Sequence, residues 1–404
     1  MRTPDLNWIK DPRVFQVNRL HAYSDHIYTI GKDKKPSSFS LNGTWKFNLS
    51  KNYDSCFKFF YNTEFNDSNW NDIQVPGHIQ LQGFDNPHYT DVTYPWDGHD
   101  VVKPGQIDME KNKVYQYRKT FDCPQDFIGN KLILSFEGAE SNIYVWLNGK
   151  FIGYAEDSFT PSRFDITKYI QEKDNILCVR IFQKCTGTWL EDQDMWRFTG
   201  IFRDVMIYKQ PSLHIQDLKI DTDIDLDTHK SVLSCVCKMS SNESHTLQAK
   251  LYDPQGNIVW NGNMQDTFEI PVENTCLWSS EFPNLYQLEL VLYDTNNEII
   301  ETIQEQVGFR KFTLEYGIMK LNGKRIVFHG INRHEWDPKT GRCLSQEQME
   351  EDIHMLKSLN INAIRTSHYP KNSYWYKLCD QYGIYVIDEM NLETHGARDI
   401  LPQN

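Results

Sequence analysis

Alternating apolar and other residues dominate the chain between about residues 40 and 208. Leu132, Leu134 and Phe136 occupy every second position of one run, and residues 143–147 form another. Asn148-Gly149 follows directly and favours a two-residue type I′ hairpin turn, because both central residues of that turn need positive φ. Further runs of this kind lie at 151–154, 164–170 and 176–182. This spacing predicts a jelly-roll β-sandwich over residues 41–209.

A second all-β region begins near Gln210-Pro211. Turn signals such as the stretch 253–256 separate its apolar runs. The candidate strands are 213–215, 231–237, 246–252, 258–260 and 286–293. Such spacing over roughly a hundred residues predicts an immunoglobulin-like β-sandwich at 210–308. The first residues, 1–40, are interpreted as an extended arm.

The period of the apolar pattern changes after about Phe309. Candidate strands at 325–331, 362–367 and 384–389 alternate with two candidate helices. The first helix begins at the capping box 345–348, and the second, 374–382, ends at Gly383. Strand–helix alternation is typical of a parallel α/β fold. Because a complete barrel takes about 250 residues, we expect 309–404 to contain the first three βα units of an incomplete (β/α)8 TIM barrel.

Composition narrows the function classes. The net charge of −13 argues against a nucleic-acid partner, which would need clustered Lys and Arg. No apolar run has the length of a signal peptide core or a membrane span, so we expect no membrane partner and a cytoplasmic location. The nine cysteines form no C-x-x-C pair. Cys235 and Cys237 share one strand face, which suggests either a metal site or, more simply, two thiols packed in a core.

Polar residues of catalytic type follow each strand of the third region. The three endings are 332–335 (NRHE), 365–368 (RTSH) and 388–395 (DEMNLETH). Barrel enzymes place their active sites at such strand ends. Glu393 and His395 stand two apart, so in extended backbone they point to the same side and can share a cation. Asp388 and Glu389 are adjacent and face opposite ways, so they cannot be the acid/base pair of a glycosidase.

The stretch 188–200 places three carboxylates between Trp189 and Trp196. Carboxylates bind sugar hydroxyls and indole faces stack on sugar rings, so the composition suits a carbohydrate site. A solvated surface loop is the alternative. The segment 89–96 has a similar mixture of polar and aromatic residues.

Taken together, these motifs resemble bacterial β-galactosidases of glycoside hydrolase family 2, of the large-subunit or long-chain type. The resemblance runs in order along nearly the whole chain. Its motifs are 41–45 (LNGTW), 189–197 (WLEDQDMWR), 332–335 (NRHE), 367–370 (SHYP) and 388–396 (DEMNLETHG). The family fold and activity are therefore expected here, with hydrolysis of terminal β-galactose from β-galactosides such as lactose by a retaining mechanism.

The resemblance also implies roles for single residues. His334 and His368 match histidines that hold the galactosyl ring and stabilise the transition state. Asp194 matches a sugar contact that also helps to bind Na⁺. Asp91 matches a substrate-binding position where the family usually has Asn. The exchange of Asn for Asp removes an amide donor and puts the substrate role of Asp91 in doubt. Arg365, at the second strand end, is a further candidate substrate contact.

The metal is implied by the same resemblance. Glu393 and His395 match two ligands of the active-site Mg²⁺, a cation that ordinarily prefers oxygen donors.

The family's proton-donating and nucleophilic glutamates correspond to positions beyond Asn404. We therefore expect this chain to be inactive alone, and to depend on a polypeptide that supplies the rest of the barrel or on a homo- or hetero-oligomer. Two alternatives remain: a carbohydrate-binding or complementing fragment without catalysis, and a metal-dependent hydrolase that uses Glu393 and His395. The first does not require the strand-end residues, and the second lacks a third ligand.

Overall fold

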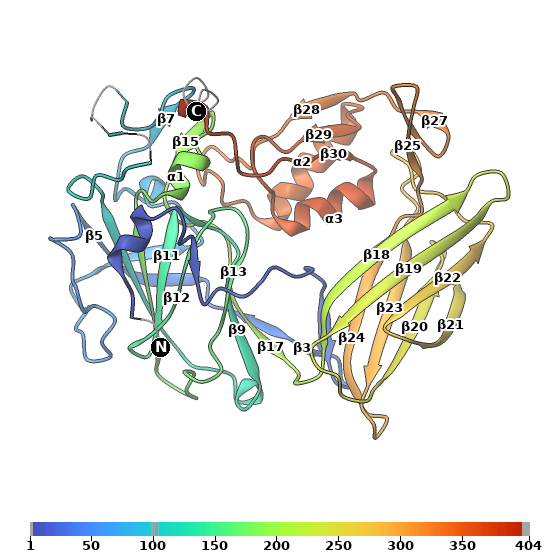
Figure 1. The fold of residues 1–404 in the computed structure, drawn as a ribbon, viewed down its shortest axis with the longest axis horizontal. Helices are drawn as coiled ribbons and strands as arrows, with labels where there is room; N and C mark the ends of the chain where they lie inside the picture. The colour runs from blue at the N-terminus through green and yellow to red at the C-terminus, as the bar shows by residue number, and fades with distance from the viewer. Residues whose placement is uncertain (1–2, 98–99, 101, 104, 398–404) are drawn as a thin grey trace.

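The computed structural model describes residues 3–97, 100, 102–103 and 105–397. Figure 1 shows three parts: an N-terminal sandwich, a second sandwich, and a C-terminal segment (residues 312–397) that lies beside both. Among these residues, the helices are all too short or too polar to cross a bilayer.

The N-terminal sandwich consists of two antiparallel sheets. The larger sheet has, in order, β1 (Gln16–Val17), β12 (Lys150–Glu156), β11 (Asn142–Leu147), β14 (Asn175–Phe182), β8 (Val114–Phe121), β5 (Gly43–Ser50) and β6 (Asn71–Val75). The smaller sheet has β13 (Ser162–Asp165), β9 (Lys131–Phe136), β17 (Val205–Gln210) and β4 (Ser38–Ser40). Short elements around the sheets are β7 (His88–Thr90) paired with β15 (Met195–Arg197), β10 (Ala139–Glu140) paired with β16 (Gly200–Ile201), and α1 (Gly187–Leu190).

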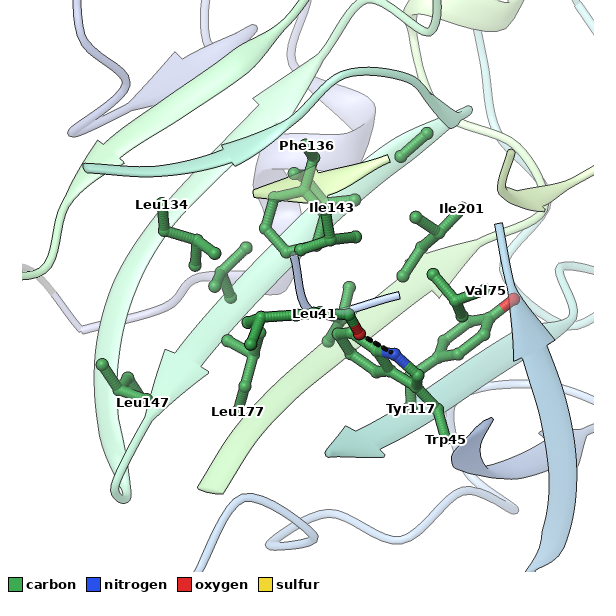
Figure 2. Close-up of a cluster of buried hydrophobic side chains, with 14 of the residues drawn as sticks. Leu41, Trp45, Val75, Tyr117, Leu134, Phe136, Ile143, Leu147, Leu177 and Ile201 are labelled. Atoms are coloured by element: carbon green, nitrogen blue, oxygen red, sulfur yellow. Dashed lines mark hydrogen bonds between the residues drawn. The ribbon is translucent and has the colours of Figure 1, made fainter. Parts of the chain in front are cut away.

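Apolar side chains from the inner faces of both sheets form one core. Leu134 and Phe136 of β9 meet Ile143 and Leu147 of β11 in this core (Figure 2). The indole Nε1 of buried Trp45 donates to the carbonyl of Leu41 at 2.9 Å. The alternation seen in the sequence therefore corresponds to inward-facing positions.

The turn at Asn148-Gly149 has the predicted geometry. Both residues have positive φ, 51° and 76°, and Leu147 pairs with Lys150 across β11 and β12. The hairpin prediction is confirmed because the signal is local to two residues.

The second sandwich also has two sheets, whose facing side chains form a separate core. One sheet has β18 (Ile215–Asp225), β19 (Lys230–Met239) and β22 (Thr267–Glu273). The other has β21 (Ile258–Met264), β20 (Thr246–Tyr252), β23 (Tyr286–Tyr293), β24 (Ile299–Val307), β2 (Tyr28–Ile30) and β3 (Lys35–Pro36). Cys235 and Cys237 are buried in this core, where burial raises the pKa of both thiols. Both thiols are therefore packed in a core, which is the simpler of the two interpretations of this pair.

The first forty residues are more regular than an extended arm. They contribute β1 and β4 to the N-terminal sandwich, and β2 and β3 to the second one. They therefore connect the two sandwiches by strand pairing. The short helical turns, all of the 3-10 type, are Leu6–Lys10, Gln80–Gln82, Gln125–Phe127 and His395–Ala397.

The C-terminal segment begins with an antiparallel sheet and continues with a parallel one. The antiparallel strands are β25 (Phe312–Glu315), β26 (Ile318–Leu321) and β27 (Lys324–Arg325). The parallel strands are β28 (Gly330–Asn332), β29 (Ala363–Arg365) and β30 (Tyr385–Ile387), separated by α2 (Gln346–Ser358) and α3 (Ser373–Tyr382). Both helix ends named in the sequence are confirmed: Ser345 and Gln348 form the capping box, and Gly383 takes the left-handed conformation after α3.

The first predicted strand of this segment, 325–331, is wrong in its extent. Arg325 belongs to β27, and the amide of Ile326 donates back to Met319 of β26. Parallel pairing begins only at Gly330, opposite Ala363. The two neighbouring sheets divide this apolar run between them, so periodicity alone does not locate the boundary.

Candidate active site

The carboxyl ends of β29 and β30 bring charged side chains into one cluster. Arg365 Nε donates to Glu389 Oε1 at 2.5 Å, and Arg365 Nη2 lies 3.8 Å from Glu393 Oε1. The Nδ1 atom of His368 lies 3.3 Å from Glu389 Oε2 and 3.4 Å from Glu393 Oε1. Parallel strands end at the same edge of a sheet, which explains why residues from separate motifs meet there.

The end of β28 adds a second imidazole. The ring centroids of His334 and His368 are 5.3 Å apart in an edge-to-face arrangement. Burial, helped by the nearby Lys371 and His368, lowers the pKa of His334 to about 4. His334 is therefore neutral at pH 7, and one ring nitrogen can donate a hydrogen bond while the other accepts one. That combination suits a sugar hydroxyl.

Asp388 and Glu389 point to opposite sides, as the strand period requires. Asp388 Oδ1 accepts from Thr366 Oγ1 at 3.0 Å and from Tyr376 Oη at 2.6 Å, away from the cluster. Glu389 instead joins Arg365 and His368. Glu389 was not among the residues that the sequence predicted for the site. The strand alternation that separates it from Asp388 was the available signal.

Glu393 and His395 lie against each other, with 3.2 Å between Oε2 and Nε2. The other ring nitrogen, Nδ1, lies 3.1 Å from the carbonyl oxygen of Asp91. Because a carbonyl only accepts, Nδ1 donates to Asp91, and Nε2 is the ring atom that faces the carboxylate. Glu393 Oε2 is buried and has no hydrogen-bond partner among the described residues. Nε2 and Oε2 are both possible ligand atoms for a cation, and a backbone carbonyl on the other ring nitrogen is typical of a metal-ligating histidine.

Further donors lie next to this pair. His368, Glu389 and Glu393 each offer one ligand atom, and these atoms lie within 4.8 Å of one another. Arg365 is ion-paired with both carboxylates and already supplies a positive charge there. The arrangement therefore favours a cation on the side of Glu393 that faces His395.

The loop between the two tryptophans reaches this cluster from the N-terminal sandwich. Its carboxylates differ in role: Glu191 accepts from the backbone and hydroxyl of Ser158 at 2.8 and 2.7 Å, and Asp192 is fully buried. Burial raises the pKa of Asp192 to about 6, although Arg197 opposes the rise. Only Asp194 stays available, with its Oδ1 accepting from Tyr89 Oη at 2.5 Å. Neither the sugar-site nor the solvated-loop interpretation anticipated two structural carboxylates here.

The site residues predicted from the sequence come from two parts of the molecule, the strand ends of the C-terminal segment and the N-terminal sandwich. Arg365, His368, Glu393 and His395 form one connected cluster, with His334 beside His368. Asp194 lies close enough to His334 to influence its pKa. Asp91 contributes its carbonyl to His395, and its side chain is exposed.

Three consecutive parts of the chain match one family of known proteins. Residues 39–211 match the sugar binding domain of the glycosyl hydrolases family 2, residues 213–310 match the domain described by the family name alone, and residues 312–403 match the family's TIM barrel domain. These ranges follow the N-terminal sandwich, the second sandwich and the C-terminal segment.

Among curated proteins, the chain is 49% identical to a beta-galactosidase of Halalkalibacterium halodurans over 97% of its own length and 40% of that protein. It is 44% identical to a beta-galactosidase of Clostridium acetobutylicum, covering 98% of this chain and 45% of the relative. It is also 42% identical to a beta-galactosidase large subunit of Leuconostoc lactis, over 97% of this chain and 66% of that subunit. The chain therefore spans less than half of the first two relatives.

Solved structures show the same fold at lower identity. A β-glucuronidase from Ruminococcus gnavus superposes with a TM-score of 0.73 at 21% identity, covering 92% of this chain and 61% of that one. A β-glucuronidase of Bacteroides uniformis gives 0.72 at 23% identity, over 88% and 42%. These likenesses concern the fold alone.

Proposed function

This chain belongs to the glycosyl hydrolases family 2, and we propose that it is the N-terminal part of a β-galactosidase that hydrolyses terminal β-galactose with retention of configuration. The observation that carries the proposal is the convergence of Arg365, His368 and Glu393 at one strand edge, directly against a loop of the sugar-binding domain. The curated relatives named beta-galactosidase support the substrate class.

The proposal includes the finer architecture. The N-terminal sandwich is a jelly roll, and β28 to β30 with α2 and α3 belong to the first three βα units of a (β/α)8 barrel. The exposed side chain of Ile387, which lies on the same sheet face as Arg365, then points into the interior of the complete barrel. Lactose and a cytoplasmic location are part of the same proposal.

In this assignment the described residues bind and orient the sugar. His334, neutral at pH 7, and His368 hold galactosyl hydroxyls, and Asp194 accepts from another hydroxyl with help from Na⁺. Trp196, two fifths exposed, offers an indole face for the sugar ring. Retaining hydrolysis also needs two glutamates about 5 Å apart, one as proton donor and one as nucleophile. The resemblance assigns both to later barrel strands, so residues 1–404 alone are inactive.

Glu393 and His395 are the proposed Mg²⁺ ligands. The fit is supported by Glu393 Oε2, which is buried without a hydrogen bond among the described residues, and by the Nδ1 contact that turns Nε2 of His395 toward it. When bound, the cation would supply positive charge beside the reacting sugar and fix the position of Glu393.

A complementation assay tests the function. Purified 1–404 should not turn over a chromogenic β-galactoside, and adding the remaining barrel of a family 2 relative should restore turnover. His368→Phe in the same mixture should abolish the recovery, whereas Lys219→Met, an exposed change on the second sandwich, should not alter it. Turnover by 1–404 alone would contradict the proposal, as would a recovered activity that prefers another glycoside. Galactose binding without any recovery would favour a carbohydrate-binding fragment.

The partner is also proposed. The relatives named large subunit belong to enzymes with a second subunit, and a small subunit of that kind is one candidate for this protein.

A further inference from the structure

The segment that carries His395 is held by the N-terminal sandwich. The amide of Thr394 donates to the carbonyl of Leu190 at 3.2 Å, and the amide of His395 donates to the carbonyl of Asp192 at 2.9 Å. The amide of Gly396 donates to the carboxylate Oδ2 of Asp192 at 2.8 Å, across 204 residues of sequence. Three successive amides of the C-terminal segment are therefore bound by two residues of the N-terminal sandwich, Leu190 and Asp192.

Asp192 is the side chain in this contact. It is fully buried, and its two oxygens have different partners: Oδ2 accepts from Gly396, and Oδ1 accepts from Arg197 Nη2 at 2.6 Å. Arg197 is fixed in turn, because Nη2 also donates to the carbonyl of Gln193 at 2.7 Å and Nε donates to Thr90 Oγ1 at 2.9 Å. Thr90 precedes Asp91, whose carbonyl orients the ring of His395. One carboxylate thus connects both supports of this imidazole.

Close packing limits the alternatives for the segment. A Cβ atom added to Gly396 would lie 2.3 Å from the ring of Tyr94, so this backbone is pressed against the sandwich. Tyr94 is itself buried against Trp96 and Trp189. A side-chain hydrogen bond from Gln193 Nε2 to Asn391 Oδ1 also connects residue 391, just before this segment, to the loop that carries Asp192.

We infer that Asp192 is a positioning residue for the cation site, which sets cation affinity by holding the 394–396 backbone and, through Arg197, the His395 ring. The inference rests on the proposed function and deepens it, since neither Asp192 nor Arg197 is among the proposed ligands of the cation or the sugar. Removing a group that orients a ligand typically weakens metal binding about 10–100-fold.

Hydrogen exchange of the peptide 391–397, measured by mass spectrometry on residues 1–404, is the first test. Asp192→Asn leaves one acceptor for two donors and should speed exchange of this peptide about tenfold. Asp192→Ala should speed it further. Asp67→Asn is the matched control, because Asp67 pairs with buried Arg118 at 2.7 Å elsewhere in the same sandwich. Parent-like exchange in both Asp192 variants would overturn the inference.

Mn²⁺ binding, followed by the electron paramagnetic resonance signal of the free ion, is the second test. Asp192→Asn should weaken Mn²⁺ binding at least tenfold, whereas Asp67→Asn should leave it unchanged even if the variant melts at a lower temperature. A purely structural role would lower both melting temperatures and spare both affinities, which would overturn the inference. Failure of the parent chain to bind Mn²⁺ would count against the proposed cation site, and the exchange experiment would then decide the role of Asp192.

Discussion

Two buried glutamates, Glu335 and Glu301, show how differently a buried carboxyl is held in different parts of this molecule. Glu335, where the N-terminal sandwich meets the C-terminal segment, is 2% exposed and accepts from Arg203 Nη2 at 2.8 Å. Burial raises its pKa, but Arg203 and Lys371 outweigh that effect and the pKa is lowered. Glu301, inside the second sandwich, is 1% exposed and has no cationic partner among the described residues. Burial raises its pKa to about 8, so this carboxyl is protonated at pH 7.

The same difference extends over both contacts of the C-terminal segment. The contact with the N-terminal sandwich contains a second buried ion pair, Arg342 with Glu140. In the contact with the second sandwich, side chains donate to backbone carbonyls: Trp278 Nε1 donates to that of Asp380 at 2.8 Å, Ser280 Oγ to that of Gly383 at 2.6 Å, and Lys357 Nζ to that of Ser280 at 3.2 Å. Charged pairs have narrow geometric requirements. The contact that positions the strand-end loops is therefore specified more tightly than the one that supports α3.

Breaking the buried pair should have the largest effect. Arg203→Met leaves the Glu335 carboxylate buried without its ion-pair partner, and loss of one partner of such a pair costs about 3–5 kcal/mol in free energy of unfolding. Urea unfolding followed by tryptophan fluorescence measures the change. The double variant Arg203→Met, Glu335→Gln removes both charges, so its free energy of unfolding should fall less than that of Arg203→Met alone. A double variant as unstable as the single one would show that the pair is not the cause.

Neutralising Glu301 should have the next largest effect, and its sign depends on pH. The folded pKa of about 8 lies above the unfolded value of 4.5, so the native state binds more protons than the unfolded state between these values. The contribution of Glu301 to the free energy of unfolding is fully present below about pH 4.5 and is lost as the pH rises to about 8. Glu301→Gln removes this loss and should gain roughly 3–4 kcal/mol in free energy of unfolding at pH 8 relative to pH 5.

Exchange of the β18 and β24 peptides, compared between parent and Glu301→Gln at each pH, measures the gain because intrinsic exchange rates cancel. Glu335 should behave in the opposite way, since its lowered pKa gives stability above pH 4.5 that is lost on acidification. A Glu301→Gln gain that is equal at pH 5 and pH 8 would contradict the assigned protonation.

Weakening the contact with the second sandwich should have a smaller effect. Trp278→Phe keeps most of the buried ring but removes the hydrogen bond to the carbonyl of Asp380. This loss should lower the free energy of unfolding by about 1 kcal/mol. Faster exchange at the C-terminal end of α3, with unchanged exchange at 391–397, would show that this contact supports the helix alone. Equal changes in both peptides would remove the distinction between the two contacts.

Sequence signals succeeded where they were local. The hairpin at Asn148-Gly149 and the capping box at Ser345 each depend on neighbouring residues, and both are confirmed. Strand β22 was missed although every second residue is buried, because Pro271 lies within it. A proline is tolerated there because β22 is an edge strand. Edge position is a property of the assembled sheet, which the sequence does not reveal.

The candidate site shows the same limit. Strand-end motifs located Arg365, His368 and Glu393, because the ends of parallel strands meet. Asp192 was interpreted as part of a sugar-binding loop, and its bond to Gly396 joins residues 204 positions apart. The carboxylates at 191, 192 and 194 look alike in sequence, and only packing distinguishes the two buried ones from the third.

Asp91→Asn should have the smallest effect, and it contrasts two identical substitutions beside the same imidazole. Asp91 supports His395 through its carbonyl and its side chain is exposed, so replacing its carboxylate by an amide should change the free energy of unfolding by less than about 0.5 kcal/mol. Asp192→Asn alters a buried carboxylate that serves two donors. Exchange of peptide 391–397 should therefore match the parent in Asp91→Asn and rise in Asp192→Asn. If Asp91→Asn increased the exchange of peptide 391–397 as much as Asp192→Asn does, the segment would depend on local charge rather than on the buried carboxylate. The charged contact with the N-terminal sandwich would then not be the one that positions the cation site.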